Sequence, residues 1–542
     1  MKNVFTSRSF ITLFLLILFL LSLRVDYRFI ETINCCGDDH TYFVHAETIA
    51  EDFDLDYSNQ MNFVEGKTII VNEKVVPIGF IGSGILSAPF MYFGILIDNL
   101  LDTINVENSR MMNYKILLYS LSPVIYLFLT IFIFIKLLQF LNIKNKTYFV
   151  FIVLFGSGVH YYAFERYSMT HIYEVFLITL LIYLLCIFYK SDNVNNFVSI
   201  IIPIIFLLAY LVRYINYFIF VIPFWISKLI IKDTDKKLIK NKLFIMSSIT
   251  SLGIFSYISN YLYGRISFNP IVVYNKQSFP LLNQYVDKSV ERGNFFLDNL
   301  SILTKMFFTQ EFGIIWFTPI VVFGITAIFF DLLKKYKKQK LPYLVLLLTI
   351  GFPIGITLIW ESVGSGYGMR YIYCVVPICL LVYLVINHQN NMKYLNYLLI
   401  SLSIFSFFSV LFFETSASTS LSEQEVVNTW GYMVRYAQPN YLSGVFSSFL
   451  NFGSYLIIFG TSFFGAIIIK FLSSLMGLDE FILSLSNIGI SVDNADVLRI
   501  FNNIDSINGH KFIFIFFMFF FVARYFSKII TKELAIWLIT KK

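Results

Sequence analysis

Long apolar runs recur along almost the whole chain, with short polar segments between them. Runs of about twenty residues are long enough to cross the hydrocarbon core of a bilayer as α-helices. A membrane β-barrel would instead show shorter segments in which apolar and polar residues alternate. The pattern therefore predicts an all-α polytopic membrane protein that contains about 12–13 transmembrane helices.

The predicted spans follow directly from these apolar runs. They lie near residues 10–23, 116–135, 147–162, 171–189, 197–212, 214–231, 243–262, 312–333, 341–360, 371–386, 395–413 and 453–472. A further apolar run begins at Phe512. Simple alternation leaves the C-terminal tail outside, whereas its basic residues favour the inside, so the side of the C-terminus stays open.

Basic residues assign the two sides of the membrane, because lysine and arginine collect in cytoplasmic loops. Lys2 and Arg8 precede the first span, which places the N-terminus in the cytoplasm. No small-residue cleavage site follows, so the first span is expected to be retained. Residues 26–78 then form a polar first outer loop.

One apolar stretch, which starts at Pro77 and includes residues 83–98, does not fit this alternation. If it crossed the membrane, Lys136, Lys144 and Lys146 would lie outside, against the positive-inside rule. Its two prolines and its glycines also make a poor straight spanning helix. We therefore predict that residues 83–98 form an interfacial helix.

The composition supports a membrane protein and argues against other classes. Of the 542 residues, 57% are hydrophobic and only 14% are charged. About a quarter of the residues in a soluble domain are charged. The formal net charge of +7 is explained by basic residues in short loops between spans, so it does not indicate nucleic-acid binding. Five cysteines give no disulfide framework.

Residues that could carry chemistry gather at the start of the first outer loop, in Gly37-Asp38-Asp39-His40-Thr41-Tyr42. A carboxylate at a membrane surface can deprotonate an acceptor hydroxyl, or it can bind a divalent cation through its oxygens. A solvated acidic loop is the simpler alternative. His40 and His45 stand near these acids, but no established zinc spacing is matched.

Ionisable residues at or near membrane depth form a second group of candidates. They are Glu165, Arg166, His171, Glu174, Arg213, Glu361 and Arg370. Such residues are costly in lipid and usually face a cavity or a partner. An arginine fork is suited to a phosphate, whereas ion pairs that only hold helices together are the structural alternative. Glycines precede Arg370 in the turn 364–370, where they favour either a phosphate cradle or simply a tight turn.

Four stretches, taken in order, resemble the GT-C superfamily of integral-membrane glycosyltransferases, and within it the bacterial relatives of protein O-mannosyltransferases and aminoarabinose transferases. They lie at residues 37–42, 77–94, 310–319 and 360–377. The first is similar to an Asp-Glu motif in the first outer loop of the family, and the second to its juxtamembrane helix. The third resembles a later span, and the fourth an outer turn that enters a span.

The resemblance covers residues 1–415, which are therefore expected to form a GT-C-type transmembrane catalytic module. Residues 416–542 are expected to add a C-terminal outer loop and further transmembrane segments. The resemblance implies that a sugar moves, with inversion, from a polyprenyl-phosphate carrier to a cell-envelope acceptor. The expected site is the outer face of a bacterial plasma (inner) membrane.

Carried over by position, Asp38 is the catalytic base and Asp39 takes the place of the glutamate. Arg370 and Arg166 are the candidates for the donor phosphate. The candidates for other substrate contacts are His40, Tyr42, His171 and Glu174. An aspartate replaces the glutamate, and His40 stands where many members have proline. Which acid acts as the base therefore stays open.

The implied partners are a polyprenyl-phosphate-linked sugar, an acceptor that is a glycan, lipid or protein, and the bilayer. Some members of the family need a divalent cation and others do not, so the cofactor stays unknown. A transporter or flippase for lipid-linked sugars is an alternative, although such proteins usually show repeated halves, and no repeat is found here. An envelope-polymer polymerase or ligase would also consume lipid-linked sugar.

Overall fold

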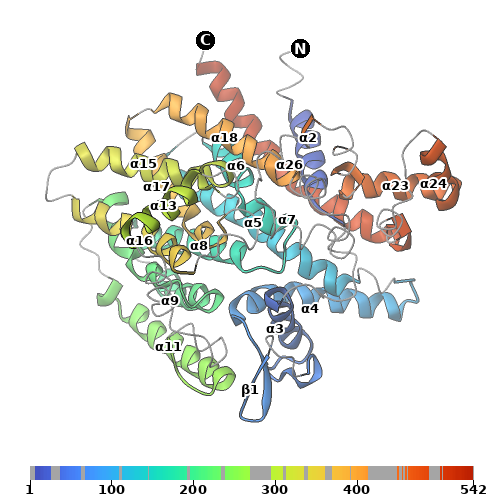
Figure 1. Cartoon of the computed structure of the whole chain (residues 1–542), viewed down its shortest axis with the longest axis horizontal. Coiled ribbons are helices and arrows are strands. Elements are labelled where there is room, and N and C mark those ends of the chain that lie inside the picture. Colours follow the sequence, from blue (N-terminus) through green and yellow to red (C-terminus); the bar gives the residue numbers. More distant parts are fainter. Residues whose placement is uncertain are drawn as a thin grey trace.

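The computed structural model of this chain is dominated by helices (Figure 1). It describes residues 7–25, 37–62, 68–108, 113–143, 146–191, 196–232, 238–268, 295–308, 313–334, 340–360, 369–390, 392–412, 449–450, 455, 458–460, 462–487, 501–502 and 504–540. Within these residues the two strands form a single hairpin. The all-α class that the apolar runs predict is confirmed.

Seven of the described helical segments are long and apolar enough to cross a membrane. They are α4 (Ile81–Thr103), α5 (Tyr114–Phe140), α8 (His171–Lys190), α11 (Lys242–Tyr263), η7 (Arg370–Val375) with α17 (Val376–Asn390), α18 (Lys393–Leu411) and the first part of α26 (Gly509–Thr540). Several helices of this kind fit an integral multi-pass membrane protein, as predicted.

Shorter apolar helices complete the bundle. They are α2 (Arg8–Ser22), α9 (Asn196–Val212), the segment made of η2 (Tyr217–Val221), α10 (Ile222–Trp225) and η3 (Ile226–Ile230), α16 (Lys340–Trp360) and α23 (Phe463–Met476). The other helices are α6 (Thr147–Phe155), α7 (Val159–Phe164), η4 (Leu238–Lys240), α13 (Phe295–Phe308), α14 (Ile314–Phe317), α15 (Pro319–Lys334) and α24 (Leu478–Asn487).

The predicted first outer loop is itself folded over the residues that the structure describes. It contains α3 (Gly37–Glu51), η1 (Tyr57–Asn59) and an antiparallel hairpin of β1 (Thr68–Val71) and β2 (Lys74–Pro77). The turn between the strands has positive φ at both central residues, Asn72 and Glu73, as a two-residue hairpin loop requires. Figure 1 shows α3 and β1 at the end of the molecule opposite both termini.

Helix α4 packs closely on three neighbouring segments through its glycines. A Cβ atom added to Gly82 would lie 2.3 Å from the backbone nitrogen of Val212 at the end of α9. At Gly84 it would lie 2.5 Å from the Cβ of His45 on α3, and at Gly94 it would lie 2.2 Å from a backbone oxygen of α5. Small residues therefore let these backbones approach as they do in other membrane helix pairs. The length and hydropathy of α4 also suit a spanning helix, so its interfacial position stays a prediction.

Several of the predicted spans are not single regular helices, and two of them show why. The segment 147–162 is divided at residues 156–158 into α6 and α7, and Gly156 there lies against the backbone of Ser403. The segment 214–231 passes from a 3₁₀-helix through a short α-helix to a π-helix, and Pro223 stands near the first change. Proline lacks an amide hydrogen, and glycine admits a close backbone contact, so both favour such breaks.

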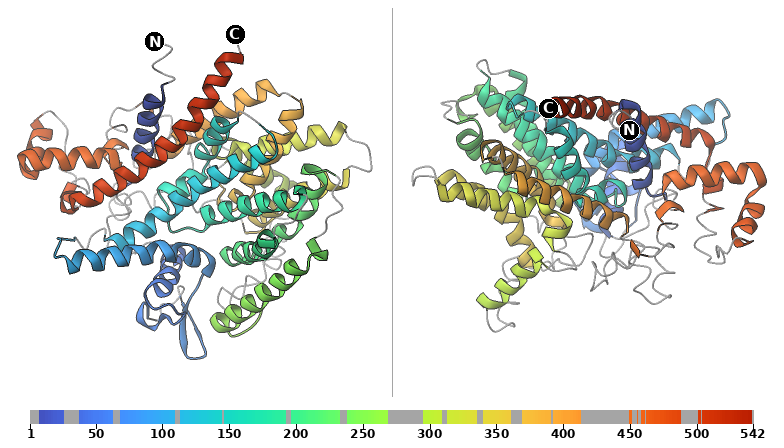
Figure 2. Two further views of the ribbon diagram at one scale, coloured as in Figure 1. Left: turned by 180° about the vertical axis from the view of Figure 1, so that it is seen from behind. Right: turned by 90° about the horizontal axis from the view of Figure 1, so that it is seen from above.

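The C-terminal helix is part of the same bundle as the first helix. Helix α26 lies beside α2 in both views of Figure 2, and Thr12 donates a 2.7 Å hydrogen bond to Ser527. The backbone amide of Thr147 on α6 also donates to the carboxylate of Glu533. The predicted boundary at residue 415 stays a prediction, because residues 413–448 lie outside the described part of the chain.

The glycine contacts of α4 generate a test of this packing. Gly94→Ala places a methyl group against the Tyr114 backbone oxygen, which cannot turn away as a side chain could. Overpacking of this kind costs about 1–3 kcal/mol of stability, so the melting temperature in detergent should fall. Gly253→Ala is the control, because the new Cβ on α11 meets nothing within 4 Å. Equal stability of the two variants would contradict the close contact of α4 with α5.

Candidate functional site

The N-terminal half of α3 is fixed to the turn between α7 and α8 by a buried ion pair. A guanidinium nitrogen of Arg166 lies 3.2 Å from Oδ2 of Asp39, and the Ser168 hydroxyl donates a 2.8 Å hydrogen bond to Oδ1. The Asp39 and Arg166 side chains are only 2% and 3% exposed. A buried charge is tolerated when it is paired and hydrogen-bonded, and both oxygens of Asp39 meet this condition.

A second set of charges fixes the other end of α3. The Lys115 ammonium group at the start of α5 lies 2.5 Å from both Glu47 and Glu51. Burial is the largest influence on Glu47 and raises its pKa, while Lys115 opposes this shift. Between the two anchors, the Nδ1 atom of His45 lies 2.7 Å from the Tyr57 hydroxyl, and burial lowers the pKa of His45 to about 3. His45 is therefore neutral and holds α3 against η1.

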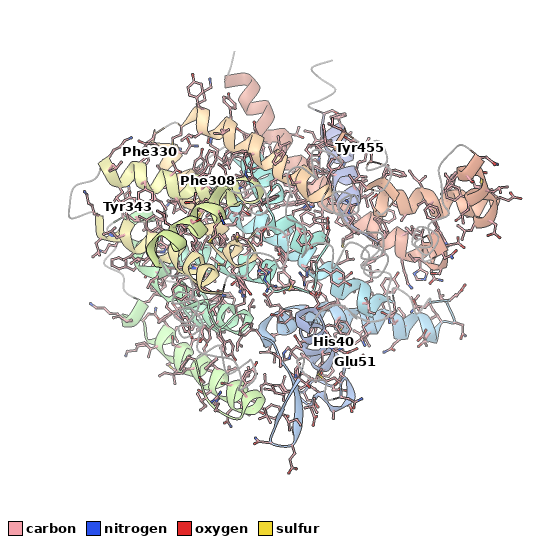
Figure 3. All side chains as sticks on the ribbon, in the orientation of Figure 1. His40, Glu51, Phe308, Phe330, Tyr343 and Tyr455 are labelled. Carbon is pink, nitrogen blue, oxygen red and sulfur yellow. The ribbon has the colours of Figure 1, made fainter. Side chains whose placement is uncertain are left out.

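Asp38 precedes Asp39 on α3 and therefore lies about 100° from it around the helix axis. Its side chain lies outside the described part of the structure. His40 is half-buried, and Figure 3 labels it together with Glu51 on the lower side of the molecule. The two adjacent acids therefore occupy different positions around α3, and Asp39 is the one fixed to the α7–α8 turn.

A second cluster lies where α8, the end of α9 and η7 meet. The Arg213 guanidinium lies 3.4 Å from Oε2 of Glu174, and Nδ1 of His171 lies 3.9 Å from the same oxygen. Arg213 also covers the ring of Tyr371, with its central carbon 4.4 Å from the ring centroid. Arg370 approaches the same ring at 4.9 Å and donates a 2.9 Å hydrogen bond to its hydroxyl. Two arginines therefore meet at one tyrosine.

Tyr42 relates α3 to the second cluster electrostatically. It follows Asp39 by three residues, so the two side chains share one face of α3. Tyr42 is buried and lies within electrostatic range of Arg213. The predicted residues Asp39, Arg166, Tyr42, His171, Glu174 and Arg370 are thus brought into one region. Arg213 stands out in the sequence as a charge between apolar runs, but nothing in the sequence indicates its contact with Tyr371.

A third buried ion pair, between Arg24 and Glu165, holds separate segments of the chain together. Nε of Arg24 lies 3.8 Å from Oε1 of Glu165, and both side chains are 1% exposed. Arg24 also donates hydrogen bonds of 2.8 Å and 3.1 Å to the backbone oxygens of Ile458 and Leu411. We therefore interpret Glu165 as a residue of an ion pair that holds helices together, and not as a substrate contact.

No group of three or more metal-ligating side chains is found among the residues that the structure describes. Asp38 is not among the side chains that this finding covers, so the question of a divalent cation stays open. The glycine-rich turn at 364–368 and Glu361 also lie outside the described residues. Arg370, at the far end of that turn, begins η7 and is half-buried.

No protein-family model and no curated protein matches this chain. Among solved structures, the chain is similar to the archaeal oligosaccharyltransferase AglB from Archaeoglobus fulgidus, in complex with an inhibitory peptide and a dolichol-phosphate. The two share 12% sequence identity at a TM-score of 0.32, over 79% of this chain. The match spans 60% of the length of the oligosaccharyltransferase. Similarity at this level assigns no activity, so a function has to be argued from the site.

Removal of one partner of the Asp39–Arg166 pair should destabilise the protein. Asp39→Asn leaves the Arg166 guanidinium buried beside a neutral amide, and such a change typically costs about 3–5 kcal/mol. The double variant Asp39→Asn/Arg166→Gln should lose less than the sum of the two single changes, because neither partner is then charged. Thermal unfolding in detergent measures the three losses.

The exposed pair of Asp56 and Lys74 is the matched control. Its nitrogen and oxygen also lie 3.2 Å apart, but its side chains are 40% and 48% exposed. Asp56→Asn should leave the melting temperature unchanged, because water already solvates both groups. If Asp39→Asn were as harmless as Asp56→Asn, the buried pair would not be the anchor of α3.

Proposed function

We propose that this chain is a GT-C-type membrane glycosyltransferase that moves a sugar from a polyprenyl-phosphate carrier to a cell-envelope acceptor, on the outer face of a bacterial plasma membrane. One observation carries the proposal. The helix with the adjacent acids is fixed by the buried Asp39–Arg166 pair, and Tyr42 of the same helix lies within electrostatic range of Arg213, which meets Arg370 at the ring of Tyr371. Sugar transfer from a phosphate carrier needs a base and phosphate-binding cations in one place.

The reaction is a single displacement at the anomeric carbon of the sugar. A carboxylate takes the proton of an acceptor hydroxyl, and the acceptor oxygen forms a bond to the anomeric carbon from the face opposite the carrier. The bond between that carbon and the phosphate oxygen breaks, so the configuration is inverted. The phosphate leaves with the bonding electron pair and is stabilised by nearby cations.

Asp38 is assigned the role of the base, and Asp39 the role of a positioning residue. Both oxygens of Asp39 already accept hydrogen bonds, from Arg166 and Ser168. These two partners hold the Asp39 carboxylate in place, which suits a positioning role. Asp38 lies beside it on the same helix and is positioned by the same anchor.

Arg370 is assigned to the carrier phosphate, together with Arg213 in place of Arg166. The Arg166 guanidinium is used to hold Asp39, whereas Arg213 and Arg370 meet at Tyr371. Glu174 pairs with Arg213 and orients it, and His171 lies beside the same Glu174 oxygen. A guanidinium can donate two parallel hydrogen bonds to a phosphate, which is the geometry that this role requires.

Loss of the base should slow the chemical step without loss of the fold. Asp38→Asn is nearly isosteric but cannot take the acceptor proton, so single-turnover transfer should fall at least about a hundredfold. The purified protein is incubated in nanodiscs with a panel of radiolabelled polyprenyl-phosphate sugars, and donor binding is measured on the same samples. Donor binding should be retained.

Asp54→Asn is the control for this test, because Asp54 is an exposed acid in the same predicted loop. It should transfer sugar at the normal rate. Full transfer by Asp38→Asn, with loss of transfer but not of stability in Asp39→Asn, would exchange the two roles. If no sugar were transferred from any donor, and the protein instead moved lipid-linked sugar between leaflets of a liposome, the transporter hypothesis would replace this proposal.

If Arg370 binds the carrier phosphate through its guanidinium fork, a positive charge alone at position 370 should not be sufficient for donor binding. Arg370→Lys keeps the charge but loses the fork, so donor affinity and transfer should both fall by about tenfold or more. Arg265→Lys is the control, since Arg265 is an exposed arginine that follows α11. Normal turnover by both Arg370→Lys and Arg370→Ala would remove Arg370 from the site.

A further inference from the structure

An apolar groove lies between α9, the segment from η2 to η3, and α11. Its volume is about 700 Å³, within the range of ligand-binding cavities. The side chains that line it include Pro203, Phe206, Tyr210, Phe224, Ser248 and Phe255. Helices α9 and α11 run side by side, because Asn241 bonds to Ser199 at one end and the rings of Tyr210 and Phe255 lie 5.6 Å apart at the other.

The two ends of this groove differ in charge. At one end the lining includes Ser227, Lys228 and Leu238, and at the other it includes Tyr210 and Phe268. None of the described residues that line the groove is acidic. Lys228 lies in the π-helix η3, and such turns often occur at functional sites.

The charged end also begins a strongly basic connection of the chain. The sequence from Lys228 to Lys242 contains six lysines and two aspartates. Basic segments next to a membrane span attract anionic lipids, with about 1 kcal/mol for each lysine or arginine near the surface. By the positive-inside rule this end faces the cytoplasm.

The length of the groove corresponds to one leaflet. The lining residues of α11 extend from Phe244 to Phe255, which is about 16 Å at the helical rise of 1.5 Å per residue. One leaflet is about half of a hydrocarbon core that is about 30 Å thick. A single acyl chain fits this depth, with its headgroup at Lys228.

We propose that this groove binds one anionic glycerophospholipid of the cytoplasmic leaflet. An acyl chain lies between α9 and α11, and the headgroup phosphate is bound by Lys228 and Ser227. This site is separate from the proposed sugar-transfer site, where the arginines lie near α3 and η7. The lipid occupies a space that none of the described side chains fills, and so it stabilises the packing of α9 on α11.

Native mass spectrometry of the delipidated full-length protein tests this site. Phosphatidylglycerol and phosphatidylcholine with identical acyl chains are the two probes. One phosphatidylglycerol should bind at least about fivefold more tightly than phosphatidylcholine, and Lys228→Gln should remove most of this difference. Lys334→Gln is the control, because Lys334 is an exposed lysine on α15 that does not line the groove.

A second variant tests the position of the acyl chain. Ser248→Phe fills the groove and should lower the affinity for both lipids, while its melting temperature reports whether the protein still folds. Equal affinity for the two lipids, together with no effect of Lys228→Gln, would overturn the proposal. Displacement of the bound phosphatidylglycerol by polyprenyl phosphate would overturn it too, because the groove would then belong to the sugar carrier.

Discussion

The buried ion pair between Asp39 and Arg166 is the constraint on which the candidate site depends. In a membrane protein, lipid tails compete with apolar side chains, so helix contacts gain little from the hydrophobic effect and depend more on close packing and polar contacts. A buried carboxylate and guanidinium must stay close together, because separation would leave each charge buried without its partner. This pair therefore holds α3 against the turn between α7 and α8, and Tyr42 on the same helix lies within electrostatic range of Arg213.

The class of fold could be predicted from the sequence, because apolar length is a local signal; the same kind of signal selected the candidate site residues, whose roles stay a prediction. Apolar length identified most of the helices, and ionisable residues at membrane depth identified Arg166, His171, Glu174 and Arg370 as candidates. The spacing of His171 and Glu174, three residues apart on α8, already places them on one face. Which charges would meet was not a local property.

The features that the sequence did not predict arise from contacts between distant segments. Arg213 and Tyr371 are far apart in the chain, and no periodicity connects them. The break between α6 and α7 has only glycine as a local signal, and the decisive contact is with the backbone of Ser403. The hairpin of β1 and β2 was not predicted either, because strands of four residues are too short to show a clear alternation of apolar and polar residues.

The contacts of Arg24 can form only late in the synthesis of the chain. This arginine lies two residues after the end of α2, its acceptor oxygens belong to Leu411 and Ile458, and its carboxylate partner is Glu165. When α2 has just been synthesised, none of these partners has been made, so they cannot yet bury the guanidinium. The contacts of Arg24 can therefore form only after most of the chain has been made, and a chain that stops before Leu411 lacks two of them.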